Sequence, residues 1–102
     1  MNAVEQDVRS LVDKELAAAN ERFPQFHSQH EGYAVILEEL EETKESLCNM
    51  ELTLKQAWGH IKDNRSARFE LVLAGLVAQN VACEAIQVAA MCRKFMEMED
   101  KQ

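Results

Sequence analysis

Proline and glycine, the residues that most often interrupt regular structure, are scarce in this chain, with one proline and three glycines among 102 residues. Strands joined by tight turns and long loops both need such residues, so their scarcity argues against a β-rich fold. Hydrophobic residues make up 47% of the chain, which is typical of a globular protein. The composition therefore predicts an all-α protein with a single domain.

Cysteine is too sparse to define a covalent or metal framework. The three cysteines are odd in number and none belongs to a CxxC pair, so neither a disulfide framework nor a zinc site is indicated. We expect Cys48, Cys83 and Cys92 to be small, buried, reduced thiols.

Positive charge is in the minority, because 11 lysines and arginines stand against 18 acidic residues and give a net charge of −7. Nucleic-acid backbones and anionic membranes attract the opposite sign, so we expect no direct binding to either. If this protein binds phosphates, a metal ion must mediate the contact.

The chain also shows no secretory signal, because residues 1–16 contain acidic side chains where a signal has a basic start and an apolar run. The most apolar stretch, residues 71–91, is interrupted by Gln79, Asn80, Glu84 and Gln87, and a charge at its centre would be costly in lipid. We therefore expect a cytoplasmic protein without a membrane-spanning segment.

Apolar residues recur at helical spacing in three segments of this single domain. Residues 1–27 contain an N-terminal helix and a turn at Pro24, which disfavours helix in the residue before it. Residues 28–61 form either one long helix or two, because Asn49 and Gly59 are weak points, and the helix begins after Ser28, whose spacing to Glu31 is that of a capping box. Residues 66–98 form a long apolar helix. The predicted fold is a bundle of three to four helices, completed by a homodimer or a higher even oligomer.

The spacing also predicts which side chains the bundle buries. We expect Phe23 and Phe26 to fold back onto the helices. A stripe on the second helix should be buried, as should the apolar line of the last helix. The residues of the stripe are Tyr33, Ile36, Leu37, Leu40 and Leu47, and those of the line are Val77, Val81, Val88, Met91 and Phe95.

Three carboxylates, those of Glu38, Glu39 and Glu42, lie within about one turn of the second helix, where like charges repel. Such a cluster is either a solvated helix face or a set of oxygen ligands for Mg²⁺. A second acidic element facing the cluster would distinguish the two interpretations.

The last helix supplies an acidic residue within its apolar line. Glu84 lies there, with Asn80 four residues before it and Gln87 three residues after it. A buried carboxylate needs a cation, a hydrogen-bond donor or water. The polar strip Asn80, Glu84, Gln87 is therefore either part of a ligand site or a core contact that fixes the register of the helices.

The segment EGYAVILEELEE, with its EExxE unit, is followed by a helix bearing EAIQVAAMCRKF. This combination resembles the small, often phage-encoded members of the all-α nucleoside-triphosphate pyrophosphohydrolase (MazG-like) superfamily, over roughly residues 20–98. The family pattern is EExxE and then ExxD on antiparallel helices, whose carboxylates hold Mg²⁺ for cleavage between the α and β phosphates. The resemblance implies that Gln87 stands where the family has its last Asp. It further implies that the metal-binding and catalytic residues are Glu38, Glu39, Glu42 and Glu84.

Three functions follow as hypotheses. The first is a pyrophosphohydrolase that uses Mg²⁺, with Mn²⁺ as an alternative. The second is a nucleotide-binding protein that sequesters its ligand without hydrolysis, because Gln87 removes one negative charge from the site. The third is a structural helical module. The candidate ligand-binding residues are Asn80, Gln87, Lys62 and Arg65; the last two flank a predicted turn, where they either reach outer phosphates or are simply solvated.

Overall fold

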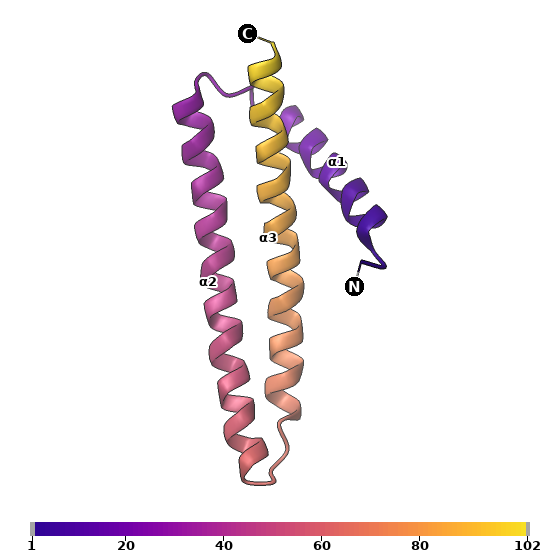
Figure 1. Cartoon of the computed structure of the whole chain (residues 1–102), viewed down its shortest axis with the longest axis vertical. Coiled ribbons are helices and arrows are strands. Elements are labelled where there is room, and N and C mark those ends of the chain that lie inside the picture. Colours follow the sequence, from indigo (N-terminus) through magenta and orange to yellow (C-terminus); the bar gives the residue numbers. More distant parts are fainter. Residues whose placement is uncertain (1, 102) are drawn as a thin grey trace.

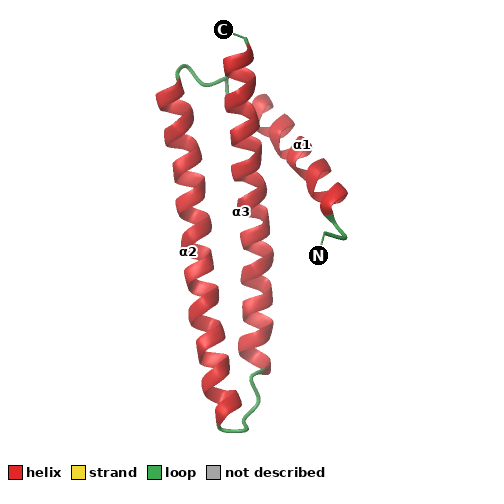
Figure 2. Cartoon of the chain, viewed as in Figure 1, coloured by secondary structure: helices red, strands yellow, loops and turns green. Residues whose placement is uncertain are grey.

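The computed structural model describes residues 2–101 and contains three helices, α1 (Glu5–Arg22), α2 (Gln29–Lys62) and α3 (Arg68–Asp100) (Figures 1 and 2). The long helices α2 and α3 form an antiparallel hairpin, and α1 packs on α3 without contacting α2 (Figure 1). The molecule is elongated, with extents of 60 × 28 × 22 Å. The all-α bundle is thus confirmed, and the second helix is continuous.

The start of α2 follows local sequence signals. The chain leaves α1 at Arg22, two residues before Pro24, as the restriction on the pre-proline residue predicts. The Ser28 hydroxyl then accepts a 3.1 Å hydrogen bond from the Glu31 amide and caps α2. The Glu31 carboxylate does not complete the capping box. It lies 2.9 Å from Nδ1 of His27 instead.

The seam between α2 and α3 has the alternating three- and four-residue spacing of a coiled coil. The apolar line of α3 follows this spacing and is partly buried along its whole length, as predicted. The buried positions of α2 carry short side chains, which are Gly32, Thr43, Thr53 and Ala57, and Ser46 is partly buried on the same seam.

The predicted apolar stripe of α2 is largely wrong for the single chain. Tyr33 is 64% exposed, and Leu40 and Leu47 are also exposed, whereas Ile36 and Leu37 are partly buried. The physical reason is that the short side chains of α2 face α3 and leave its larger apolar row outside. Two smaller expectations are corrected as well. Phe23 is exposed, and the cysteines are free as predicted but exposed.

A tight contact joins the start of α2 to the C-terminal part of α3. A Cβ on Gly32 would lie 2.5 Å from the Phe95 ring and 3.0 Å from the Phe26 ring, so only glycine fits there without displacing an aromatic ring. Gln25 donates a 3.0 Å hydrogen bond to the Lys94 carbonyl, which ties the α1–α2 connection to α3. Phe26 is consequently buried, as predicted.

The helix α1 packs through a small core of Val12 and Leu16 against Ala90 of α3. By length and composition, α3 alone among the described helices could cross a membrane. A core helix of a soluble bundle has the same properties, although most of this stretch is not buried within one chain.

Candidate functional site

Glu39 is the centre of the acidic region. Its carboxylate lies on the α2 seam, and its Oε2 atom is enclosed without a hydrogen-bond donor. Burial raises the pKa of Glu39, and repulsion from Glu42, Glu38, Glu15 and Glu84 raises it further. The structure therefore brings predicted carboxylates of α2 and α3 into electrostatic range of one another, together with Glu15 of α1, which sequence analysis did not single out.

Glu84 has hydrogen-bond partners. Its Oε1 atom accepts a 2.6 Å hydrogen bond from the Ser46 hydroxyl of α2 and a 3.0 Å hydrogen bond from the Asn80 amide. The structure thus brings Asn80 and Glu84 together. These two donors also explain how a carboxylate is accommodated in a line of valines.

A cavity of about 1140 Å³ lies where α1 and α2 approach α3. Its polar wall includes Glu31 and Glu39 of α2, and Gln87 and Lys94 of α3. Most of the remaining lining is apolar. These residues are Ala18, Ala19, Phe23, Pro24, Phe26, Val35 and Met91. A cavity with one charged region and one apolar, partly aromatic region suits a ligand that carries both anionic and aromatic groups.

Gln87 is half-buried in the wall of this cavity, which it shares with Glu39. The position at which the sequence departs from the family pattern therefore faces the same space as the central carboxylate. A neutral amide there adds an oxygen donor without adding negative charge.

Lys94 is a second residue that sequence analysis missed. Its side chain is 2% exposed, lines the cavity, and places Nζ 5.2 Å from the centre of the Phe26 ring. One signal was present in the sequence, because Asn80, Gln87 and Lys94 follow one another at intervals of seven residues. The polar strip therefore continues one heptad further along α3.

Lys62 and Arg65 do not join this site within one chain. Lys62 ends α2, and 23 residues separate it from Glu39, or about 35 Å of helix at a rise of 1.5 Å per residue. Arg65 lies in the following turn, where it is exposed and its guanidinium is 3.5 Å from the Asp63 carboxylate.

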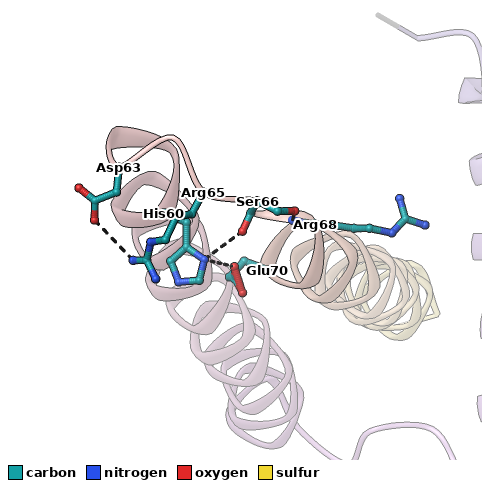
Figure 3. A network of polar contacts seen from close by, with 6 residues as sticks. All are labelled: His60, Asp63, Arg65, Ser66, Arg68 and Glu70. Carbon is teal, nitrogen blue, oxygen red and sulfur yellow. Dashed lines mark hydrogen bonds and ion pairs between the residues drawn. The ribbon is translucent and has the colours of Figure 1, made fainter.

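The far end of the hairpin carries its own polar network (Figure 3). Nδ1 of His60 lies 3.1 Å from the Ser66 carbonyl and 3.0 Å from Oε1 of the buried Glu70. Both neighbours are acceptors, so Nδ1 carries a proton. Nδ1 meets the criteria for a hydrogen bond to the Ser66 carbonyl, whereas Oε1 of Glu70 is buried without a hydrogen-bond donor. The network joins the end of α2 to the start of α3, whereas Arg68 points away from it (Figure 3).

The fit of the acidic residues to a divalent cation is partial. Within residues 2–101 no three His, Cys, Asp or Glu side chains are close enough together to hold a metal ion. Mg²⁺ commonly uses only one or two carboxylates and takes its remaining ligands from water and substrate phosphates. The donor-free oxygen of Glu39 and the carboxylates around it meet that smaller requirement.

No family model matches this chain, and no curated protein or solved structure matches it.

Proposed function

We propose that this protein binds a nucleotide together with Mg²⁺ in the cavity between α1 and α2 and cleaves it between the α and β phosphates. The observation that supports this proposal most is Glu39, which lines the cavity and has a donor-free oxygen and a raised pKa. Four acidic neighbours contribute to that raised pKa, and one of them, Glu15, also lines the cavity. An arrangement of this kind concentrates negative charge, and a divalent cation neutralises it.

In this proposal the carboxylates that would hold the cation are those of Glu39 and Glu84, with Glu38 and Glu42 as further ligands. Bound Mg²⁺ would neutralise the polyphosphate and lower the pKa of a ligated water. The chain's own contribution is to orient the nucleotide. The apolar part of the cavity would hold the base or sugar, and Gln87 would act as a neutral hydrogen-bonding group near the phosphates.

A second candidate function is capture of the nucleotide without hydrolysis. Two observations favour it, namely the neutral Gln87 in the cavity wall and the lack of a group of three metal ligands among residues 2–101. Fewer anionic ligands weaken both the retention of Mg²⁺ and the activation of water.

Incubation of the protein with a panel of nucleoside triphosphates and Mg²⁺ tests these functions, with released pyrophosphate and retained nucleotide both measured. Release that disappears in chelator and in Glu39→Gln supports the hydrolase. Retention without release supports the binding protein. If neither occurs for any nucleotide, both proposals fail and the chain is a structural module.

A further inference from the structure

Lys94 is an almost fully buried cation, and the little surface that remains exposed includes its Nζ atom, which is not among the fully enclosed polar atoms that lack a hydrogen-bond partner. Only 2% of its surface is exposed, and it is the largest side chain of the described residues to be so fully buried. A buried lysine without a counter-charge is costly, because the ammonium group loses its hydration and gains nothing equivalent in return. Such residues are almost never found fully buried unless they are paired.

No pairing partner for Lys94 occurs between residues 2 and 101. No carboxylate oxygen lies within 4 Å of its Nζ, and its ammonium group donates no hydrogen bond there. The Phe26 ring, 5.2 Å away, offers a cation–π contact worth about 0.5–2 kcal/mol. That contact satisfies none of the three N–H donors of an ammonium group.

Two opposite charges therefore line one cavity without pairing with each other. Lys94 provides donors without an acceptor, and Glu39 provides an oxygen without a donor. We propose that Lys94 binds an anionic phosphoryl group of the ligand that occupies this cavity. Lysine is a common point-charge ligand for phosphate, and the naming of a phosphoryl group rests on the proposed function.

The position of Lys94 sets the orientation of the ligand in the cavity. The phosphoryl group held by Lys94 lies at the wall formed by α3, which Lys94 shares with Gln87. Four acidic residues line the cavity against two basic ones, so a polyphosphate without cations would be repelled. Lys94 therefore neutralises one phosphoryl group, and the remaining negative charge requires the divalent ion.

The test is titration of the protein with inorganic pyrophosphate, with and without Mg²⁺, followed by calorimetry. Lys94→Met keeps the apolar stem and removes the charge, and Lys44→Met, at an exposed position on α2, is its matched control. We expect Lys94→Met to weaken pyrophosphate binding at least tenfold in Mg²⁺ and Lys44→Met to leave it unchanged. We also expect Lys94→Met to unfold at a higher temperature than the wild type without ligand, because an unpaired buried charge has been removed.

A spectroscopic measurement on the wild-type protein does not depend on how the variant folds. The side-chain ammonium resonance of Lys94 should shift on addition of pyrophosphate, and those of exposed lysines should not. Equal pyrophosphate affinity in Lys94→Met and wild type, or an unmoved Lys94 resonance at saturation, would overturn the inference. If nucleotide and Mg²⁺ still bind in that case, the proposed function stands. If pyrophosphate binds through Lys94 but no nucleotide does, the proposed function alone fails.

A separate observation concerns the surface of the hairpin. The chain of 11.6 kDa exposes 7696 Å², whereas a compact monomer of that mass exposes about 5,800 Å². The excess of about 1,900 Å² exceeds the roughly 800 Å² that each partner buries in an ordinary stable interface. A second copy of this chain would bury that excess.

Exposed apolar residues of the hairpin are arranged in two matching rows. Exposed large residues recur every seven positions on α2, and exposed small residues lie on α3. The α2 row is Tyr33, Leu40, Leu47, Leu54 and Ile61, and the α3 row is Gly75, Ala78, Ala82 and Ala85. A Cβ on Gly75 would meet nothing within 4 Å, which shows that this row is open.

Both rows lie on the same side of the hairpin, opposite the cavity. In an antiparallel pair with a seven-residue repeat, residues that follow the seam on either helix share one side. Leu40 follows the seam residue Glu39, whereas Val35 and Gln87 precede seam residues and line the cavity. We propose that two copies pair through this face about a two-fold axis, with the large row of each copy against the small row of the other.

Analytical ultracentrifugation of matched variants tests this interface. Leu47→Glu changes the proposed face, and Leu52→Glu makes the same change at an exposed leucine on the other flank of α2. We expect wild type and Leu52→Glu to be dimers at micromolar concentration and Leu47→Glu to be a helical monomer by circular dichroism. A monomeric wild type, a dimer that survives Leu47→Glu, or a wild type that floats with lipid vesicles would each overturn the proposal.

Discussion

The Ser46 hydroxyl of α2 and the Glu84 carboxylate of α3 are joined by a 2.6 Å hydrogen bond across the hairpin seam. Neither helix buries these groups alone, so the contact depends on the register between the helices. The same carboxylate contributes to the repulsion that raises the pKa of Glu39. Glu84 therefore connects the packing of the hairpin to the electrostatics of the candidate site.

Ser46→Ala should destabilise the fold by about 1–2 kcal/mol, because Glu84 then keeps only its Asn80 donor and a partly buried carboxylate loses a hydrogen bond. Ser10→Ala is the matched control, since it removes an exposed hydroxyl from α1 and gains the same helix propensity. Urea denaturation in chelator measures both variants. Equal effects in the two would mean that the Ser46 contact does not stabilise the seam.

Glu39→Gln should stabilise the protein at pH 7 in chelator by about 0.5 kcal/mol, the scale of like-charge repulsion on a helix. The pKa of Glu39 is raised in the folded state by burial and by Glu42, Glu38, Glu15 and Glu84. The folded state therefore holds this proton more tightly, and stability is lost as pH rises from the ordinary carboxyl range through the raised pKa.

The advantage of Glu39→Gln should accordingly vanish as the pH is lowered to about 3, which is below the ordinary Glu pKa, so that Glu39 is protonated in both states. Urea denaturation across the pH range measures it. Glu41→Gln, at an exposed position of the same helix that does not line the cavity, serves as the control. A gain that is independent of pH, or that is matched by Glu41→Gln, would show that Glu39 does not carry this repulsion.

Gln87→Asp should lower stability in chelator by about 1 kcal/mol, the size of an ordinary unfavourable substitution, because it adds a carboxylate to a cavity that already contains Glu39. Addition of Mg²⁺ should recover the loss if the cation lies within reach, since binding to the folded state stabilises it. Thermal unfolding with and without Mg²⁺ measures this, with Gln79→Asp on the exposed surface of α3 as the control. The same loss in both conditions would place Gln87 outside the reach of the metal.

The sequence predicted the helices and the polar strip but not which faces meet. Caps and breakers act locally, so Pro24 correctly located the end of α1 and Ser28 the start of α2. Hydrophobic spacing identifies apolar faces but does not show which of them another helix of the same chain covers. Leu40 and Leu47 were therefore expected to be buried, whereas the buried residues of this part of α2 are Thr43 and Thr53. The cavity brings together residues more than 50 positions apart, such as Glu31 and Lys94, and no local pattern encodes that proximity.

The central claim is that Glu39 and a divalent cation hold a nucleotide at the cavity between α1 and α2. The most direct measurement is calorimetric titration with a nucleoside triphosphate analogue that cannot be cleaved between its α and β phosphates, in Mg²⁺ and in chelator. We predict saturable binding in Mg²⁺ and loss of that binding in chelator. We also predict a Kd for Glu39→Gln that is at least tenfold higher than the Kd for the Glu41→Gln control. Absence of binding in Mg²⁺, or equal affinity in chelator and in Glu39→Gln, would contradict the account.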